Sequence, residues 1–243
     1  MVNIVHKMIK RYKRKLKQKS CLNVHLKTRD RNPKLYKLID VLIEQYRKSG
    51  GLSHEYQAYK LYCLYNLLYS HNPKSILEFG SGSSTLLFGH YVKNAKASFL
   101  SIDENEKWAL NTKQLVYDMI GISLNIIHSP KIFVDTKKTL EMRYAYHPKG
   151  YFDFVFIDGP SLRINDVQYK NAVNSDVFSI LPLPKVIVVD VRRATAEHLI
   201  DKYKDFYEAK LSDLFSDGIV GDNYNYFSIF INKNNDKLMK ASH

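Results

Sequence analysis

The sequence predicts an α/β protein with a doubly wound sheet of seven strands, mostly parallel with an antiparallel terminal strand, preceded by helices. Three features indicate this fold: after Pro73 short apolar runs alternate with helix-length segments, a glycine turn follows the first run, and no helix separates the last two runs. Of the 243 residues, 45% are hydrophobic and 25% are charged. These values fit one folded domain and exclude a wholly disordered or coiled-coil chain.

The N-terminal segment is strongly basic. Residues 1–37 contain 13 lysines and arginines and one acid, a net charge of +12, which leaves 24 basic and 23 acidic residues, or +1, for the rest. Apolar residues recur between these charges at helical spacing, namely Val2, Val5, Ile9, Tyr12 and Leu16. The pattern predicts a basic amphipathic extension. It is compatible with a solvated tail, with an anionic membrane surface bound through residues 1–19 and, less well, with nucleic acid.

A connector and two helices are expected next. Residues 20–33 lack apolar periodicity and contain Asn32-Pro33, so we expect a break there. Helical spacing returns over residues 35–47, and a second helix is expected from near Ser53. The predicted organisation is a basic extension (1–34), one domain (35–232) with N-terminal helices (35–72), and a disordered tail (233–243).

The central part of the chain alternates between strand and helix candidates. The predicted strands are Ser75–Phe79, Ala97–Ile102, Ile122–Ile127, Phe152–Ile157 and Lys185–Val189. The segments between them predict helices near 84–93, 105–120, 135–145 and 166–180. This alternation indicates a parallel sheet with helices on both faces. The last two runs, Phe206–Leu211 and Tyr224–Ile231, predict an antiparallel pair at its end.

A glycine turn follows the first predicted strand. Gly80 and Gly82 allow the backbone to turn sharply and approach a ligand, and the next helix begins with free N–H groups. The second strand leads into Asp103, about twenty residues further on, where an acid can accept hydrogen bonds from both hydroxyls of a ribose. A nucleotide-like cofactor therefore fits. The turn can also serve packing alone, and Asp103 can also cap the helix that begins near Glu106.

Three segments together resemble the class I, Rossmann-type S-adenosylmethionine-dependent methyltransferases: Glu78-Phe-Gly80-Ser-Gly82-Ser-Ser84-Thr85, Ser101-Ile-Asp103-Glu-Asn-Glu-Lys-Trp108 and Phe152-Asp-Phe-Val-Phe-Ile-Asp158-Gly-Pro160. The resemblance covers residues 53–232. It implies S-adenosylmethionine as the cofactor, with Glu78 and the glycine backbone beside its methionine part, Asp103 at its ribose and Trp108 near its adenine. The implied cofactor-binding residues are Glu78, Phe79, Gly80, Ser81, Gly82, Ser84, Asp103 and Trp108. Thr85 replaces the third glycine of the dinucleotide-binding pattern, which disfavours a dehydrogenase.

Two carboxylates follow neighbouring strands of the predicted sheet. Asp158 and Asp190 come directly after their strands, and ligands bind at the carboxyl ends of strands in such sheets. The pair can hold a divalent cation such as Mg²⁺, which would lower the pKa of an acceptor hydroxyl, or one carboxylate can act as a general base without metal. The pattern resembles the metal-dependent catechol-type O-methyltransferases, but Val191 stands where they have asparagine. Asp158 is the first candidate for the base.

Basic side chains near the same strand ends are the candidates for binding the acceptor. Arg163 and Arg193, with the adjacent Arg192, can bind an anionic group, and His54 is a further candidate contact. The segments that carry the two aspartates loosely resemble glycan-modifying O-methyltransferases, which implies a sugar hydroxyl, or that of another small molecule, as the acceptor. Two alternatives remain: an RNA 2′-hydroxyl methyltransferase that binds phosphates with the basic tail, and a non-catalytic module that binds S-adenosylmethionine.

The cellular location that we expect is inferred from features that the sequence lacks. Cys21 and Cys63 have the spacing of neither a disulfide framework nor a zinc site. No apolar run is long enough to span a bilayer, and the basic start is not followed by the apolar stretch of a signal peptide. We expect a cytoplasmic protein, which lies at the membrane periphery if its basic extension binds lipid.

Overall fold

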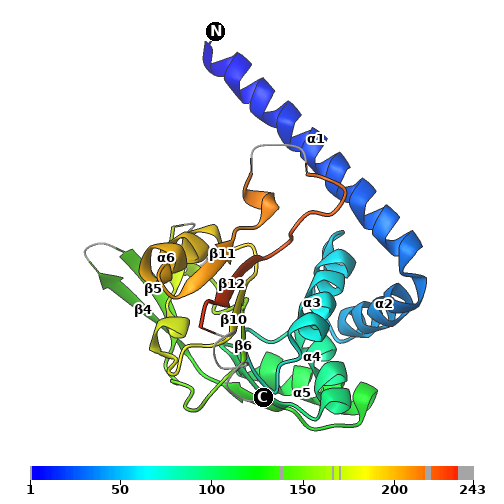
Figure 1. The fold of residues 1–243 in the computed structure, drawn as a ribbon, viewed down its shortest axis with the longest axis vertical. Coiled ribbons are helices and arrows are strands. Elements are labelled where there is room, and N and C mark those ends of the chain that lie inside the picture. Colours follow the sequence, from blue (N-terminus) through cyan, green and yellow to red (C-terminus); the bar gives the residue numbers. More distant parts are fainter. Residues whose placement is uncertain (1, 137–138, 166, 170, 217–219, 235–243) are drawn as a thin grey trace.

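The computed structural model describes residues 2–136, 139–165, 167–169, 171–216 and 220–234. At the centre of this part of the chain lies a seven-stranded sheet (Figure 1) in the order β11-β12-β10-β6-β1-β2-β3. Its strands are β1 (Ser75–Phe79), β2 (Ser98–Asp103), β3 (Asn125–His128), β6 (Phe154–Ile157), β10 (Val186–Val189), β11 (Tyr207–Lys210) and β12 (Ser228–Asn232). All neighbours are parallel except β12, which is antiparallel to β10 and β11. The predicted doubly wound sheet with an antiparallel terminal strand is confirmed.

Helices cover one face of the sheet, and a thinner layer covers the other. The first layer contains α2 (Pro33–Lys48), α3 (Gln57–His71), α4 (Ser83–Ala95) and α5 (Glu106–Ile120). The second contains α6 (Arg193–Tyr203) and the 3-10 helix η1 (Asp176–Ser179), near two small sheets made of β4 (Lys131–Thr136), β5 (Thr139–Tyr144) and β9 (Val173–Asn174), and of β7 (Arg163–Ile164) and β8 (Val167–Gln168). Along β6, Phe154 and Phe156 face the first layer, whereas Val155 and Ile157 face the second. Alternate side chains of a buried strand therefore fill two cores.

Two helix predictions are wrong, and α6 was not predicted. Within residues 135–145, the described positions 135–136 and 139–144 lie in the antiparallel strands β4 and β5, where the β-branched Val134, Thr136 and Thr139 favour extended backbone. The Thr136 hydroxyl donates to the carbonyl of its cross-strand partner Thr139 at 2.7 Å. Residues 166–180 contain β8, β9 and η1 in their described part. Both segments are long enough for a helix. Their polar and β-branched residues, however, do not form the apolar stripe that a helix buries.

The connector predicted over residues 20–33 is also wrong. Helix α1 (Val2–Arg31) is one continuous helix, and its second half buries Cys21 and Val24 on one face. This docked face is short and partly polar, so hydrophobic periodicity did not reveal it. The break falls at Asn32, and Pro33 is the first residue of α2, where the missing proline N–H removes no helical hydrogen bond.

The remaining sequence predictions differ from the structure mainly at element ends. Helix α3 begins at Gln57 and not near Ser53, while the helices predicted near 84–93 and 105–120 are confirmed as α4 and α5. Most of the tail predicted to be disordered, residues 235–243, lies outside the described part. Among the described helices, none has the length and apolar character that crossing a bilayer requires.

Helix α1 projects from the domain and docks on the chain between β11 and β12 (Figure 1). Lys17 Nζ donates to the carbonyl oxygens of Asp213 at 3.0 Å and Leu214 at 2.8 Å. The Ser20 hydroxyl donates to the Val220 carbonyl at 2.7 Å. Side chains of α1 therefore donate hydrogen bonds to backbone carbonyls of the β11–β12 connection, which do not belong to a sheet.

His25 extends this contact to the first helical layer. Its ring stacks on Tyr59 of α3 at a centroid distance of 4.4 Å, and its Nε2 lies 2.8 Å from the Tyr224 hydroxyl. Burial, followed by the neighbouring His54 and Arg29, lowers the pKa of His25 to about 4. Helix α1 therefore docks with His25 neutral at physiological pH.

Acid is expected to weaken this docking. The unfolded chain protonates His25 near its usual pKa of about 6.5, but the folded chain does so near 4. The contribution of neutral His25 is therefore complete above about pH 6.5 and is lost as the pH falls towards 4. Between about pH 7 and pH 4.5, the wild-type protein should lose about 2–3 kcal/mol more stability than His25→Phe, which keeps the ring stack. Urea unfolding at both pH values measures this difference, and equal losses would contradict it.

Candidate active site

The parallel register brings the ends of β1, β2 and β6 to one edge of the sheet. Gly80, Asp103 and Asp158 lie there because Phe79 pairs with Ile102 on one side and with Ile157 on the other. Gly80 has a φ of +93°, and a Cβ on it would lie 2.9 Å from the backbone of Asp158. The glycine turn therefore has a packing role, in addition to any contact with a ligand.

Glu78 lies behind the glycine turn, fully buried. Its carboxylate accepts hydrogen bonds from the hydroxyls of Ser84 at 2.6 Å, Thr85 at 2.7 Å and Ser101 at 2.8 Å. Burial raises the pKa of Glu78 to about 8, against the lowering effect of these three donors. The hydroxyl of Thr85 also accepts from the Gly82 N–H at 2.7 Å. Glu78 and Ser84 thus hold the turn in place and do not line the cavity beside it.

The first cavity at this edge matches the place of the predicted cofactor. Its lining residues are Gly80, Ser81, Asp103, Glu104, Asn105, Trp108, Tyr144, Asp158, Gly159, Pro160, Ser161 and Arg192. Four predicted cofactor residues are among them: Gly80, Ser81, Asp103 and Trp108. The Trp108 indole N–H donates to the Ser81 carbonyl at 3.1 Å, and its ring meets Tyr46 of α2 edge-on at 5.5 Å. Phe79 and Gly82, also predicted cofactor residues, are not part of this lining.

Asp103 connects the end of β2 to the glycine turn. Its Oδ2 accepts from the Ser81 N–H at 2.8 Å and from the Ser81 hydroxyl at 2.7 Å, while Oδ1 accepts from the Asn105 N–H at 2.9 Å. The alternative that Asp103 caps α5 is wrong, because Asn105 is the cap and its side chain accepts from the Trp108 N–H at 2.9 Å. Oδ1 of Asp103 has capacity for one more donor at the cavity.

A lysine that sequence reasoning missed lies between the two predicted catalytic carboxylates. Val189 pairs with Ile157, so the following residues, Asp190 and Asp158, are neighbours. Lys60 of α3 donates from Nζ to Asp158 Oδ2 at 2.8 Å and to Asp190 Oδ2 at 2.5 Å. The side chains of Lys60 and Asp190 are 7% and 11% exposed and that of Asp158 is 32% exposed, so one ammonium and one buried carboxylate meet a second carboxylate that is partly exposed.

The cluster does not fit the Mg²⁺ alternative. The Lys60 ammonium holds the position between Asp158 and Asp190 that a shared cation would need, and it already supplies the compensating charge. The described residues contain no group of three or more histidine, cysteine, aspartate or glutamate side chains arranged to hold a metal ion. We therefore derive no metal-assisted step for this pair.

The two carboxylates have different electrostatic environments. Burial favours a higher pKa for Asp158, but Lys60 and then Arg192 outweigh it and hold that pKa below its usual value. Burial and then the charge of Asp158 raise the pKa of Asp190 to about 7, even though Lys60 opposes the shift. Asp190 Oδ1 is buried and has no hydrogen-bond partner among the described residues. Asp190 Oδ1 is thus a carboxylate oxygen that neither Lys60 nor Arg192 contacts, although the two carboxyl groups lie within hydrogen-bond reach of each other.

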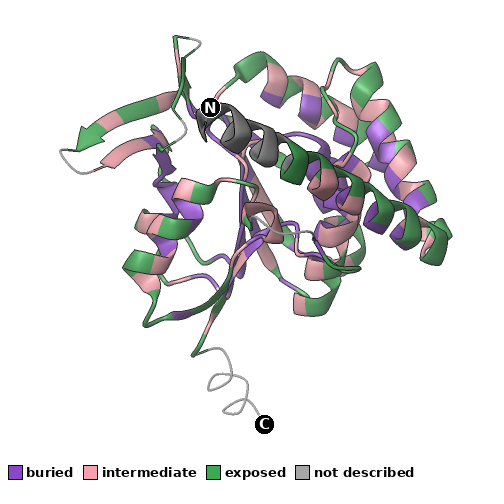
Figure 2. Ribbon diagram, turned by 90° about the horizontal axis from the view of Figure 1, so that it is seen from above, coloured by how far each residue is buried: buried purple, intermediate pink, exposed green. Residues whose placement is uncertain are grey.

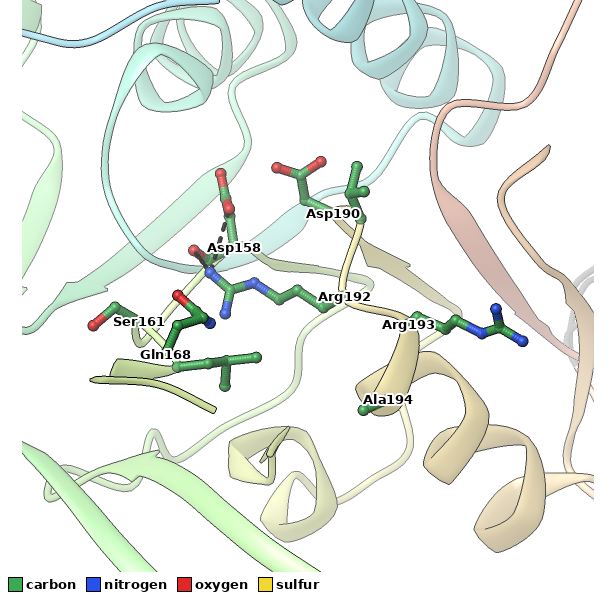
Figure 3. Close-up of a pocket in the computed structure, with 9 residues that line it drawn as sticks. Asp158, Ser161, Gln168, Asp190, Arg192, Arg193 and Ala194 are labelled. Atoms are coloured by element: carbon green, nitrogen blue, oxygen red, sulfur yellow. Dashed lines mark hydrogen bonds and ion pairs between the residues drawn. The ribbon is translucent and has the colours of Figure 1, made fainter. Parts of the chain in front are cut away.

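A second cavity lies on the other side of Asp158 (Figure 3). Its lining residues are Asp158, Ser161, Leu162, Gln168, Asp190, Val191, Arg192, Arg193 and Ala194. Asp158, Ser161 and Arg192 line both cavities, so the two spaces meet at these side chains. Val191, at the mouth, has a φ of +40°, a strained backbone for a β-branched residue of a kind that clusters at functional sites.

Arg192 fixes the wall that the two cavities share. Its Nη1 donates to the Pro160 carbonyl and to Asn174 Oδ1, both at 2.9 Å, and its Nη2 donates to the Asp158 carbonyl. The guanidinium is therefore committed to holding the loop after β6 and is poorly placed to bind an acceptor on its own.

The predicted acceptor residues are only partly brought together. Arg193 lines the second cavity and is paired with Glu197 at 2.7 Å. Arg163 lies on β7 with its Nε 3.1 Å from Gln168 Oε1, and it is not a lining residue. His54 lies in the loop before α3, where its Nδ1 accepts from the Tyr56 N–H at 3.1 Å, and it lines neither cavity.

Comparison with known proteins supports the fold. No protein-family model matches the chain, and no curated protein matches its sequence. The solved structure of an O-methyltransferase from Bacillus cereus, in complex with S-adenosylhomocysteine, matches 80% of this chain and 90% of its own, with a TM-score of 0.52 and 14% identity. The fold is that of the class I methyltransferases. A candidate O-methyltransferase from Klebsiella pneumoniae shares this methyltransferase fold over 80% of this chain and 89% of its own, with a TM-score of 0.50 and 16% identity.

Proposed function

We propose that the chain is an S-adenosylmethionine-dependent methyltransferase that methylates a hydroxyl oxygen of a glycan or another small molecule. The observation that carries this proposal is the meeting of two cavities at Asp158, next to a buried Asp190 oxygen without a partner. One cavity suits a nucleoside and the other a polar acceptor. A group transferred between them would pass the only place where both cavities share lining residues in the described structure.

The first cavity fits S-adenosylmethionine by the chemistry of its lining. Asp103 Oδ1 can accept from a ribose hydroxyl, and the Trp108 ring offers an apolar face for a purine. Asp158 and Glu104 add negative charge, which favours a cationic ligand. The cofactor supplies a methyl group that its sulfonium has already activated.

The chain itself must then orient the acceptor and take up its proton. A hydroxyl loses its proton when its oxygen is methylated, and a base in hydrogen-bond reach accelerates that loss by about 10²–10⁴. Asp190 suits this role better than Asp158, because Lys60 does not contact its Oδ1 and its pKa of about 7 lies near physiological pH. We therefore assign the proton transfer to Asp190 Oδ1, with Lys60 and Asp158 setting its charge. This assignment replaces the expectation that Asp158 is the base.

The second cavity supports a hydroxyl-rich acceptor. Ser161, Gln168 and Arg193 contribute hydroxyl, amide and guanidinium groups, which form the directional hydrogen bonds that a sugar requires. Leu162 and Ala194 provide the small apolar part of the lining. A glycan or a small polyhydroxylated molecule therefore fits this lining better than an apolar one.

Calorimetric titration followed by an acceptor screen tests the proposal. The purified chain is expected to bind S-adenosylmethionine and S-adenosylhomocysteine, but not NAD. Formation of S-adenosylhomocysteine is then measured with a panel of sugars, other small hydroxyl compounds and RNA, with and without magnesium. Turnover with RNA alone would replace the proposed acceptor class. Cofactor binding with no turnover on any acceptor, and no effect of Asp190→Asn in cells, would favour the non-catalytic module.

Asp103→Ala is expected to weaken binding of S-adenosylhomocysteine by about 1.5–3 kcal/mol, or roughly 10- to 150-fold. The substitution removes the carboxylate, and with it the contact to the ribose and the two hydrogen bonds from Ser81. Ser81→Ala is the matched control, because it removes one of those bonds and leaves the carboxylate in place, so its loss should be about 0.5–1.5 kcal/mol. Calorimetry compares both variants with the wild type. Equal losses of affinity in the two variants would show that Asp103 only holds the glycine turn and does not bind the ribose.

A further inference from the structure

Helix α1 has an outward face that no part of the described chain covers. Tyr12, Leu22 and Leu26 are 64%, 42% and 53% exposed, whereas Cys21 and Val24 on the docked face are buried. At 100° per residue, Leu22 and Leu26 lie on the side of the helix opposite Val24. Figure 2 shows exposed residues alternating with intermediate and buried ones along the described part of α1.

The same face is basic. Lys15 and Lys19 fall between Leu22, Leu26 and Tyr12 around the helix axis, and both are exposed. No acidic residue precedes Asp30 in the sequence. Large apolar side chains are therefore interleaved with positive charges, and the acid of this helix, Asp30, lies beyond Leu26 near its C-terminal end.

We propose that the outward face of α1 binds the surface of an anionic lipid bilayer. Leu22, Leu26 and Tyr12 would enter the interface between headgroups and acyl chains, and the lysines would contact anionic headgroups. Nucleic acid would use the lysines but would leave two exposed leucines without a role. A second copy of the chain would bring two segments with a net charge of +12 together, which like-charge repulsion opposes.

The docked face explains how such binding would orient the whole domain. Lys17, Ser20 and His25 fix α1 to the chain before β12 and to α3, so the helix is not a free tail over this half. A surface bound by Leu22 and Leu26 would therefore hold the catalytic sheet in one orientation. This binding does not depend on the proposed methyl transfer.

Vesicle flotation of the full chain tests the proposal. Vesicles of phosphatidylcholine with about 30 mol% phosphatidylglycerol are expected to bind the wild-type protein at least about tenfold more strongly than vesicles of phosphatidylcholine alone. Leu22→Ser/Leu26→Ser and, separately, Lys15→Glu/Lys19→Glu are each expected to lower that binding by about tenfold or more. Circular dichroism confirms that the variants remain folded.

Matched substitutions elsewhere on the protein distinguish an effect of the α1 face from an effect of removing leucine or lysine at any exposed position. Leu52→Ser/Leu110→Ser removes two leucines that are 92% and 62% exposed, and it is expected to leave binding unchanged. Lys149→Glu/Lys210→Glu makes the same change of net charge away from α1. Equal losses with these controls would overturn the proposal. So would tight binding to RNA without vesicle binding, or a dimer in sedimentation that Leu22→Ser/Leu26→Ser dissociates.

Discussion

Lys60→Met is expected to destabilise the protein by about 3–5 kcal/mol at neutral pH. The lysine side chain is 7% exposed, and its removal leaves Asp158 and Asp190 side by side with no ammonium between them. Buried carboxylates that lose their partner are much more costly than exposed ones, because no solvent replaces it. Urea unfolding at neutral pH measures the loss, with methionine chosen to keep the volume of the side chain.

The pH dependence of this loss identifies its cause. Without Lys60, the pKa values of both carboxyls in the folded chain rise above those in the unfolded chain. Protonation of the carboxyls then stabilises the fold, and this stabilisation is lost as the pH rises. The deficit of Lys60→Met should therefore shrink between about pH 8 and pH 5. Asp190→Asn should restore part of the stability when combined with Lys60→Met. A deficit that does not vary with pH would instead indicate a packing defect.

An exposed lysine provides the control for this experiment. Lys27 pairs with Asp222 at 2.8 Å, and the two side chains are 53% and 70% exposed. Surface ion pairs contribute about 0–1 kcal/mol because water screens them. Lys27→Met should therefore cost far less than Lys60→Met, although both variants lose one lysine and an ion pair with aspartate.

Most of the sheet could be predicted from the sequence because its strands are buried on both faces. Runs such as Phe154–Ile157 and Val186–Val189 are continuously apolar, and that signal survives without knowledge of the neighbours. Residues 135–145 gave no comparable signal, since β4 and β5 are largely exposed or half-buried. The docked half of α1 escaped prediction for a related reason, because it is held by hydrogen bonds from Lys17 and Ser20 as much as by apolar burial.

The candidate site, like the fold, contains residues that could be predicted from the sequence and one that could not. Asp103, Asp158 and Asp190 could be predicted because each follows a strand, and strand ends in a parallel sheet converge. Lys60 could not, since it reaches the aspartates only through the packing of α3, 98 and 130 positions away in sequence. One signal was present. Lys60 falls on the stripe of Gln57, Leu61 and other residues that α3 buries, and a lysine on a buried stripe needs a charge partner.

Asp190→Asn is expected to lower kcat by about 10²–10⁴ on any hydroxyl acceptor that the screen identifies. Asparagine cannot take up the proton, but it preserves the size of the side chain and one hydrogen bond to Lys60. Affinity for S-adenosylhomocysteine should change by about twofold or less, because Asp190 does not line the first cavity. A fall in kcat with unchanged cofactor affinity separates this role from misfolding.

The pH profile distinguishes Asp190 from its neighbour. For the wild type, kcat/KM should rise with pH through an apparent pKa near 7, because Asp190 must lose its proton before it can accept another. Asp158→Asn removes the charge that helps to raise that pKa, so it should retain activity and move the inflection to lower pH. If Asp158→Asn abolishes turnover while Asp190→Asn keeps it, the base is Asp158. Because the two carboxylates share Lys60, the direction of the shift shows which of them takes up the proton of the acceptor hydroxyl and which only changes the pKa of that base.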